Sequence, residues 1–552
     1  MAIELPIKYY LDYYRYITAY VLRHYEEMLH LEELDFIESS QLMDEAAFCL
    51  YLRMANRRGL FFRPSQLNYE EVPDLEESLA ILVKNNFIEP LGKKHKTFAY
   101  DWLLSYKKAD LWDVYKTIYP TDKTLKKAGV KEALLLFLLE QTPFDDLLNN
   151  LVKKEAVYVQ GRQKEEQLVR FLFFGNLYSG TTDFVVRDVG HRSFEKKDDD
   201  DFVPIFSSRQ EVDECWVLSI ASQQWHLVAK IITPAIALSW LNRWFNPTHQ
   251  WTKKGQQKLD KLILKVGKYL EQKKMPEEAL HFYKNTKKSP SRERQARILV
   301  KLDKKEEAVA LCQIILLDAK NATESIFAKD FIARLTTTDR LKSTRKKLKE
   351  ADSIQLDQSW QYQVERGVLQ HYMNKGYEGL HAENSVWRAM FGIVFWNLLF
   401  DGESAAFHHP LQYAPSDLRL PDFYENRKDQ IDECLKILTK KENFEKHLAV
   451  LFEEKWGIHN PFIYWDFGTM EIARTLYKFV KPKPLKAVLL QMTKNVKENT
   501  KGFPDLFVWK KRAYWFVEVK SPTDMLSEQQ LFWQNFFEEH KIKTMVLKVE
   551  WK

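Results

Sequence analysis

Three charged side chains lie among apolar residues in the segment GFPDLFVWKKRAYWFVEVKSP, residues 502–522: Asp505, Glu518 and Lys520. Two carboxylates placed side by side in apolar surroundings repel each other, and a divalent cation removes that cost. Hard oxygen ligands of this kind suit Mg²⁺ or Mn²⁺. A nearby lysine can orient or deprotonate a bound water and neutralise developing phosphate charge. The pattern predicts metal-dependent phosphodiester hydrolysis, and the alternative is a Lys–Glu pair on a sheet edge.

A predicted hairpin positions these three side chains. Residues 505–509 and 513–520 have the pattern of two strands joined by a short turn. Side chains alternate faces along a strand, so Glu518 and Lys520 project from the same side. Asp505 begins the neighbouring strand, and the hairpin brings its carboxylate alongside Glu518.

Helices and one further strand complete a predicted mixed sheet. Residues 485–496 have a helical pattern, and residues 526–540 form a second helix with a clear start. Ser527 is its expected N-cap, and Gln530 occupies the capping-box position. A last strand covers residues 543–551, so the C-terminal region is expected to be an α/β domain.

The clearest helical pattern covers residues 380–400 and is apolar over much of its circumference, which predicts a buried helix. Glu383 lies at its N-terminal end, where the helix dipole favours a carboxylate. A metal ligand is the other interpretation of Glu383. This segment alone favours the simple charge complement.

The turn RMANRRGLFFR carries four arginines, with Phe61 and Phe62 between them. The turn lies within residues 46–106, whose helix, strand and helix patterns predict a small winged-helix-like module. Interleaved arginines and aromatic residues suit contact with DNA phosphates, and the alternative is a solvated surface turn. The candidate DNA-binding arginines of this turn are Arg53, Arg57, Arg58 and Arg63.

Residues 255–335 have the pattern of paired helices, because PEEALHFY near residue 276 resembles KEEAVALC near residue 305. Stacked pairs of this kind form a solenoid. A turn and a helix start between them concentrate positive charge. Such a run is either a solvated helix face or a phosphate contact. The candidate DNA-binding residues here are Lys287, Lys288, Arg292, Arg294 and Arg297.

Length and composition set broad limits. The chain has 552 residues, which corresponds to roughly three or four domains. Its net charge of +6 is too small to establish a nucleic-acid partner by itself. The 4 cysteines are scattered without a C-x-x-C pair, which argues against a zinc finger and fits a reducing compartment. No signal peptide or membrane span is apparent, so we expect a soluble intracellular protein.

Several longer segments resemble known proteins. GFPDLFVW, FVEVKSPTDMLSEQQLFW and HAENSVWRAMFGIVFW closely resemble the virus-type replication-repair nuclease (VRR-NUC) domain of the PD-(D/E)xK superfamily. Other segments resemble the Fanconi-associated nuclease family, namely LRMANRRGLFFRPSQLNYEEVPDLEESLAIL, LFFGNLYSGTTDFVVRDVG, SPSRERQARILVKL and APSDLRLPDFYENRKDQI. The tyrosine-rich N-terminus is similar to that of bacterial members. The resemblance covers most of the chain.

The resemblance implies a structure-specific DNA nuclease that cuts 5′ flaps and branched DNA, digests 5′ to 3′ and acts in interstrand cross-link repair. The implied cofactor is Mg²⁺ or Mn²⁺. The metal ligands that it implies are Glu383, Asp505, Glu518 and the backbone carbonyl of Val519. Lys520 becomes the catalytic lysine and Gln530 a supporting residue. For Glu383 the resemblance therefore reverses the interpretation that its own helix favours.

On this basis we expect a multidomain, mainly α protein. Residues 1–150 form a helical and winged-helix/SAP-like DNA-binding region, and residues 151–370 a helical-repeat (TPR-like) region. Residues 371–552 form the α/β nuclease domain with a mixed central sheet. The expected partner is branched or 5′-flap DNA, with no membrane. The expected location is cytoplasmic and nucleoid-associated in a bacterium, or nuclear in a eukaryote.

The chain departs from the family pattern in three places. Ser521 follows the lysine where the family usually has glycine, a small change that the site should tolerate. Gln529 replaces a lysine of the 5′-phosphate pocket of some members, which weakens the expectation of 5′-phosphate anchoring. The ubiquitin-binding zinc finger of eukaryotic members is expected to be absent. Two rival functions remain, a Holliday-junction-resolvase-like nuclease and a non-catalytic DNA-binding scaffold.

Overall fold

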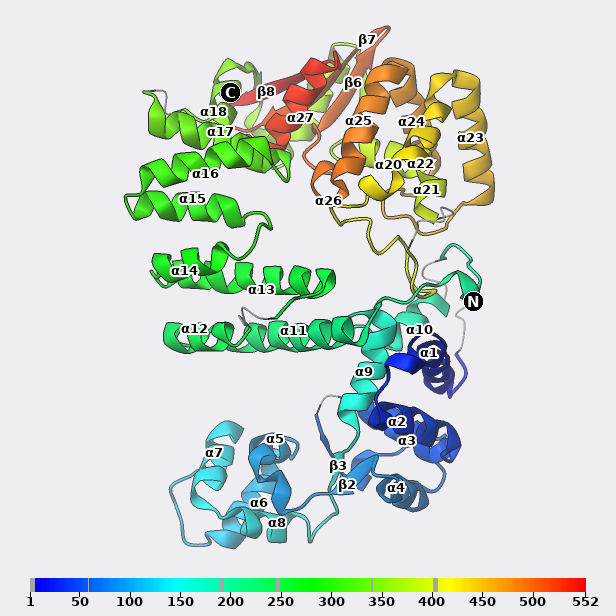
Figure 1. Ribbon diagram of the computed structural model, residues 1–552, viewed down its shortest axis with the longest axis vertical. Helices are drawn as coiled ribbons and strands as arrows, with labels where there is room; N and C mark the ends of the chain where they lie inside the picture. Colours follow the sequence, from blue (N-terminus) through cyan, green and yellow to red (C-terminus); the bar gives the residue numbers. More distant parts are fainter. Residues whose placement is uncertain (1–4, 58, 189–192, 245–248, 339–340, 401–405) are drawn as a thin grey trace. The chain divides into compact units, whose positions relative to one another are not determined.

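The computed structural model describes residues 5–552 except residue 58 and the ranges 189–192, 245–248, 339–340 and 401–405. The chain divides into two compact units (Figure 1). The first comprises residues 1–190 and 204–212, and the second comprises residues 191–203 and 213–552. Among the described residues, no helix has both the length and the apolar character needed to cross a membrane.

Helices make up most of the first unit. They are α1 (Tyr9–Tyr25), α2 (Leu31–Leu42), α3 (Glu45–Ala55), α4 (Leu75–Lys84), α5 (Ala99–Leu104), α6 (Lys108–Ile118), α7 (Lys131–Gln141), α8 (Phe144–Leu151), α9 (Gln163–Phe174) and α10 (Thr182–Asp188). The tyrosines of α1 recur at helical spacing, and Tyr10, Tyr14 and Tyr25 are almost completely buried. The aromatic stripe of α1 is therefore core.

A small antiparallel sheet accompanies α3 and α4 in the order β1-β3-β2. Its strands are β1 (Phe61–Phe62), β2 (Ile88–Pro90) and β3 (Tyr158–Gln160). The predicted helix, strand and helix pattern is present, but the central strand β3 comes from a distant segment that the sequence did not reveal. Helices α5 to α8 lie between β2 and β3 in the chain and enclose a core that also includes Phe61 of β1 and Val159 of β3.

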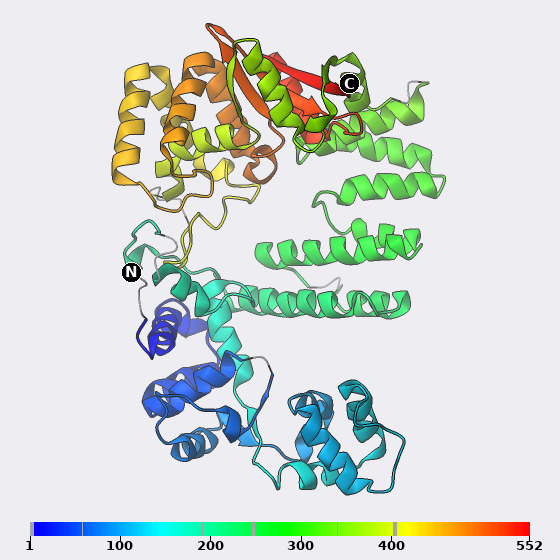
Figure 2. The same ribbon diagram turned by 180° about the vertical axis from the view of Figure 1, so that it is seen from behind.

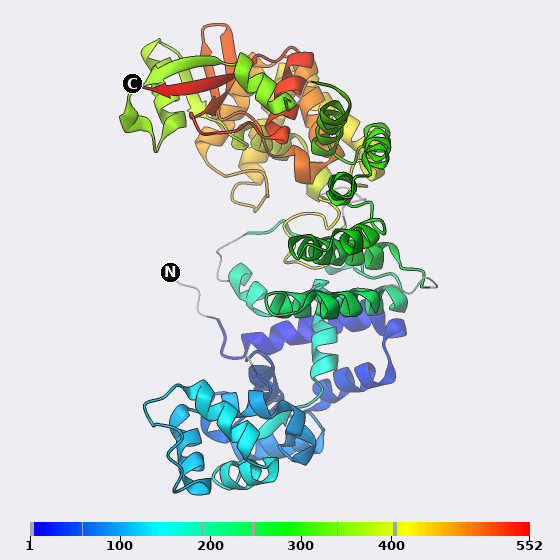
Figure 3. The same cartoon turned by 90° about the vertical axis from the view of Figure 1, so that its left-hand side faces the viewer.

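Consecutive helices also dominate the first part of the second unit. They are most of α11 (Arg209–Val228), then α12 (Pro234–Asn242), α13 (Lys253–Gln272), α14 (Pro276–Tyr283), α15 (Ser291–Lys301), α16 (Lys305–Leu317) and α17 (Ala322–Thr336). From α12 onward, each helix packs against the next one in the sequence, as can be followed in Figures 1 and 3. Their apolar faces share one continuous core.

A five-stranded mixed sheet forms the rest of the second unit, in the order β4-β8-β7-β6-β5. Its strands are β4 (Asp352–Leu356), β5 (Glu378–His381), β6 (Leu506–Lys510), β7 (Ala513–Lys520) and β8 (Thr544–Trp551). The pairs β4/β8 and β7/β8 are parallel, while β5/β6 and β6/β7 are antiparallel. Helices α19 and α27 cover opposite faces of the sheet (Figures 1 and 2).

The remaining helices of the second unit pack on this sheet or on one another. They are α18 (Ser343–Glu350), α19 (Val364–Asn374), α20 (Ser385–Val394), α21 (Trp396–Phe400), α22 (Lys428–Leu435), α23 (Lys441–Glu454), α24 (Phe467–Phe479), α25 (Pro482–Lys494), α26 (Val496–Asn499) and α27 (Glu528–Glu539). The expected long helix over residues 380–400 is divided into the end of β5, α20 and α21. The sheet also includes β4, which precedes the domain boundary that we expected at residue 371. Most of the side chains of β4 are exposed, so its sequence lacks a strand-like apolar pattern.

Candidate active site

The hairpin of β6 and β7 brings the two acids together. Leu506 is paired with Val517, and the same register continued by one residue places Asp505 opposite Glu518. Val517 and Val519 pack into the core under α19. Because side chains alternate along a strand, Glu518 points to the other face of the sheet. The predicted arrangement of the hairpin is confirmed.

Both carboxyl groups of this pair are costly to ionise. Glu518 is fully buried, at 0% exposure, and an oxygen of Asp505 (Oδ2) accepts a hydrogen bond from the backbone N–H of Val519 at 2.8 Å. Burial raises the pKa of Asp505. Burial and, secondarily, the charge of Asp505 raise the pKa of Glu518 to about 8. Ionisation of both acids in the same small volume is therefore unfavourable.

Lys520 offsets part of this negative charge. Its Nζ lies 2.8 Å from Oε1 of Glu518 and donates a hydrogen bond to Oε1 of Gln530 at 3.2 Å. The same oxygen of Gln530 accepts from the backbone N–H of Ser527 at 2.9 Å, which completes the predicted capping box of α27. The start of α27 thereby fixes the partner of the lysine.

The carboxylates have unused capacity for a cation. Neither oxygen of Glu518 receives a well-oriented hydrogen bond from the part of the chain that the structure describes, although Lys520 lies close to Oε1. A buried carboxylate without hydrogen bonds is expensive unless an ion balances it. Two adjacent carboxylates with a raised pKa are the donor set that a hard divalent cation prefers. Asp505 and Glu518 therefore fit a divalent metal.

Glu383 is tied to this pair through its backbone. Its N–H donates to the carbonyl of Asp505 at 3.0 Å, and its φ of +36° is rare for a residue with a side chain. The side chain is exposed and accepts a hydrogen bond from Nδ2 of Asn384 at 3.1 Å. It precedes α20 by two residues, so it lies outside the first turn. Within the described residues no three acids, histidines or cysteines converge on one metal-binding point, so the carboxylate of Glu383 lies apart from the pair.

Gln529 is packed inside the fold. Its side chain is 9% exposed, and a Cβ on Gly502 would lie only 2.7 Å from Cγ of Gln529. Gly502 also has a φ of +81°, so glycine is required on both counts. This contact holds the segment that leads into Asp505. The residue replacing the family's lysine therefore has a packing role here.

The arginines of the N-terminal turn differ in whether they already contact acidic or aromatic side chains of the protein. Arg53 pairs with Glu71 at 2.7 Å and stacks on an aromatic ring 4.3 Å away. Arg63 is largely buried over Tyr106. Arg57 is exposed and donates only to a backbone carbonyl in the described contacts. Arg58 lies outside the described residues.

The basic residues between positions 287 and 297 also differ in whether they are paired with acidic side chains. Arg292 is 6% exposed and forms two hydrogen bonds to the buried Glu324, at 2.7 and 2.9 Å, so it holds α15 to α17 and has a structural role where we expected a DNA contact. Arg297 pairs with Glu293 in its own helix, and Arg294 lies 3.6 Å from Glu271.

The two lysines of this group are more available. Lys287 is exposed. Burial, together with the charges of Lys261 and Lys497, lowers the pKa of Lys288. Lysines from α13, α26 and the turn after α14 thus approach one another, which only the packing of these helices reveals. Asp260 balances only part of this positive charge, and a local excess of lysines suits a polyanion.

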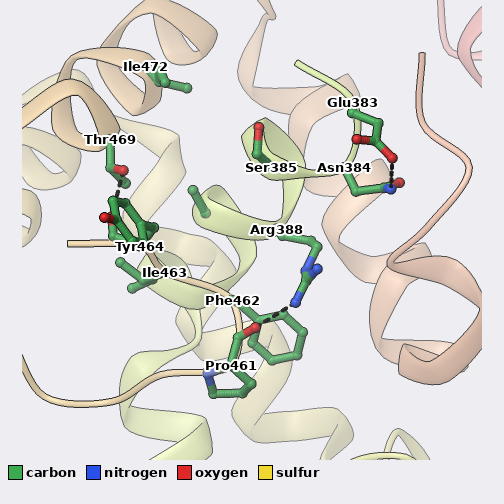
Figure 4. Close-up of a pocket in the computed structure, with 11 residues that line it drawn as sticks. Glu383, Asn384, Ser385, Arg388, Pro461, Phe462, Ile463, Tyr464, Thr469 and Ile472 are labelled. Atoms are coloured by element: carbon green, nitrogen blue, oxygen red, sulfur yellow. Dashed lines mark hydrogen bonds between the residues drawn. The ribbon is translucent and has the colours of Figure 1, made fainter. Parts of the chain in front are cut away.

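One candidate binding site, a cavity, was not predicted from the sequence. A cavity of about 390 Å³ lies between α20, α24 and residues 461–464, with Arg388 and Glu383 on its wall (Figure 4). Arg388 occurs in an otherwise apolar helical pattern, so its sequence position suggests a single polar residue on a buried helix. Nothing in the sequence indicates that the segment before α24 meets this helix.

Comparisons with known proteins agree with these features. Residues 8–89 match the family model described as FAN1, HTH domain, and residues 439–551 match the VRR-NUC domain. The Fanconi-associated nuclease 1 homolog of Pseudomonas aeruginosa is 24% identical over an alignment 561 residues long. This alignment covers 98% of this chain and 96% of that protein. The homolog of Schizosaccharomyces pombe is 34% identical over 176 residues, 31% of this chain and 24% of its own length.

The fold is also known from crystallography. A crystal structure described as paFAN1 bound to 2nt 5′-flap DNA with a gap matches with a TM-score of 0.84 and 24% identity, over 100% of both chains. The hairpin with Asp505, Glu518 and Lys520 falls within the residues that match the VRR-NUC domain.

Proposed function

This chain belongs to the Fanconi-associated nuclease family and is a DNA nuclease, and from that premise we propose that it cuts 5′-flap and branched DNA with a divalent metal ion. The observation that carries the proposal is the buried pair Asp505 and Glu518 beside Lys520, in the region that matches a nuclease domain. The flap-bound structure of the similar protein supports the substrate. The proposal includes 5′ to 3′ digestion and a role in interstrand cross-link repair.

Each residue of the site has a proposed task. Asp505, Glu518 and the carbonyl of Val519 would hold Mg²⁺ or Mn²⁺, which polarises a phosphate oxygen and lowers the pKa of a bound water. Lys520 holds a proton at Nζ next to the reacting phosphate and balances the charge that develops there. Gln530 keeps this ammonium in place through its 3.2 Å hydrogen bond.

Glu383 completes the proposed ligand set. Its backbone hydrogen bond to Asp505 ties residue 383 to the start of β6, and to bind the same ion its exposed side chain would leave Asn384 and turn toward the pair. A residue kept at a φ of +36° is one whose position the surrounding fold enforces.

Basic residues outside the nuclease domain would hold the DNA backbone. Arg57, Lys287 and Lys288 are the candidates, because none of them forms a salt bridge among the described contacts, although Asp260 lies near Lys288 and Asp318 near Lys287. Phosphate contacts carry no sequence information, so selectivity would come from the shape of the DNA branch. We further propose that α13 to α17 are TPR-like repeats, which their consecutive packing supports.

Cleavage of a labelled 5′-flap substrate tests the proposal. With Mn²⁺ or Mg²⁺ the wild type should cut near the junction, Asp505→Ala should be inactive, and Lys520→Ala should lose about 100-fold or more in rate. Equal cleavage by wild type and Asp505→Ala would overturn the catalytic assignment. Retained DNA binding without cleavage by either protein would favour a scaffold, and paired symmetric cuts in a four-way junction would favour a resolvase.

A further inference from the structure

The cavity beside the carboxylate pair has the size of a small-molecule site. Its volume of about 390 Å³ lies within the range of about 300–1,000 Å³ that is typical of such sites. The wall includes Glu383, Arg388, Phe462 and Tyr464 (Figure 4). Because the backbone of Glu383 is hydrogen-bonded to Asp505, the cavity directly adjoins the proposed active site.

Arg388 presents a guanidinium that forms no salt bridge among its described contacts, although the charge of Glu383 on the same wall acts on it. Its Nη2 donates to the carbonyl of Pro461 at 2.6 Å, and it lies 5.8 Å from the ring of Phe462. Its Nε is buried and has no hydrogen-bond partner within the described part of the chain. Arg419 brings a second positive charge nearby, and burial together with this charge lowers the pKa of Arg388. A guanidinium with spare donors suits a phosphate oxygen.

One exposed aromatic ring, Tyr464, lines this cavity, and two more occur close to it in the chain. Tyr464 is 79% exposed, Phe467 is 74% exposed and Trp456 is 45% exposed. The carbonyl of Tyr464 accepts a hydrogen bond from Thr469 at 2.7 Å, so the backbone that carries this ring is fixed (Figure 4). The rings of Trp456 and Phe467 lie 5.2 Å apart. Large aromatic side chains grouped in water mark a binding surface, and rings are the usual platform for unpaired bases.

We propose that this cavity and Tyr464 bind one unpaired nucleotide of the DNA substrate, with Arg388 on its phosphate and the ring of Tyr464 stacked on its base. The inference rests on the proposed function, because it assigns part of the same substrate to a site beside the reacting phosphate. An unpaired base is required because a paired base has both faces covered by its neighbours in the duplex. No base edge is read, so the site accepts any base.

A fluorescent base tests the stacking contact. The substrate carries 2-aminopurine at each unpaired position in turn, in Ca²⁺ or EDTA so that cleavage does not occur. Wild type should quench the fluorescence at one or two positions, and Tyr464→Ala should abolish this quenching. The affinity for flap DNA should fall about 5- to 100-fold, the range of base–aromatic stacking, with no change for a fully paired duplex.

Two variants serve as controls. Tyr464→Trp should keep or strengthen the quenching, whereas Tyr362→Ala removes a tyrosine that is 88% exposed in the same unit and should change nothing. Quenching that persists in Tyr464→Ala, or an equal loss of duplex affinity, would overturn the inference.

A neutral linkage tests the phosphate contact. A methylphosphonate at the unpaired position should weaken binding by wild type but not further weaken binding by Arg388→Gln, because the variant has already lost that contact. If the methylphosphonate and Arg388→Gln reduce the binding free energy additively, Arg388 contacts no phosphate at that position.

These experiments distinguish a failure of the nucleotide site from a failure of the proposed nuclease function. If wild type quenches at one position but cuts no flap, the nuclease proposal fails and the nucleotide site stands. If wild type cuts and Tyr464→Ala binds and quenches like wild type, the nucleotide site fails alone.

Discussion

Asp505, Glu518 and Lys520 place two carboxyl groups and one amino group at one end of the β6 and β7 hairpin. Burial raises the pKa of both acids, and that of Glu518 reaches about 8. A carboxyl group whose pKa is higher in the folded protein stabilises the fold only while it is protonated. For Glu518 that contribution is complete below the ordinary value of 4.5 and is lost as the pH rises to about 8.

Replacing one acid should therefore stabilise the metal-free protein. In EDTA at pH 8, Asp505→Asn should increase the free energy of unfolding of the nuclease domain by about 1–2 kcal/mol, because it removes one of two like charges. The gain should shrink toward pH 5 as wild type becomes protonated. Mn²⁺ should then raise the melting temperature of wild type but not of the variant. Thermal melts at several pH values measure both effects.

A surface acid provides the comparison. Glu550→Gln changes an exposed carboxylate on β8 of the same sheet and should leave the melting temperature unchanged. A variant Asp505→Asn that melts below wild type in EDTA at pH 8 would show that the hydrogen bond from Val519, rather than charge repulsion, dominates at this position.

At the scale of elements, α27 links helix capping to the proposed catalytic lysine. Gln530 accepts hydrogen bonds from both Ser527 and Lys520, so one side chain closes the helix and orients the lysine. Leu526 and Leu531 share a small core with residues of α17 and α18, which anchors this end of the helix. The position of the lysine therefore depends on the folding of a neighbouring helix.

Two substitutions in α27 should separate these roles. Ser527→Ala should cost about 1 kcal/mol of stability with little effect on the cleavage rate, because it removes only the cap. Gln530→Ala should also lower the cleavage rate about 10- to 100-fold, as for other residues that hold a catalytic group in place. Urea unfolding and single-turnover cleavage provide the two measurements. Equal cleavage rates for the two variants would mean that Gln530 has only a capping role.

At the scale of the whole molecule, the candidate phosphate contacts come from both compact units. Arg57 belongs to the first unit, and Lys287 belongs to the second. Arg53, Arg63 and Arg292, by contrast, are bound to acidic side chains within the fold. The number of basic residues in a sequence thus overstates the number free to contact DNA.

Salt dependence should report these contacts. Arg57→Ala and Lys287→Ala should each reduce the slope of log K against log salt by about one, and the double variant by about two, with similar losses on all DNA sequences. Arg15→Ala changes an exposed arginine paired with Glu45 and should leave the slope unchanged. Unchanged slopes for Arg57→Ala and Lys287→Ala would exclude these phosphate contacts.

The sequence by itself determined the parts of the site that depend on local patterns. Strand alternation predicted that Glu518 and Lys520 share a face, and the turn length placed Asp505 beside Glu518. The capping signal at Ser527 and Gln530 predicted the start of α27. These features follow from residues close together in the chain, where backbone geometry alone sets which side chains meet.

Only the tertiary structure decided the rest. Strands β3 and β4 join sheets whose other strands are far away in the chain, and their own residues carry little pattern. The partner of Arg292 and the cavity at Arg388 likewise depend on which helices pack together. Burial and pairing are properties of the packed chain, so a residue's type states which contacts it is able to make, and the fold determines which of them it makes.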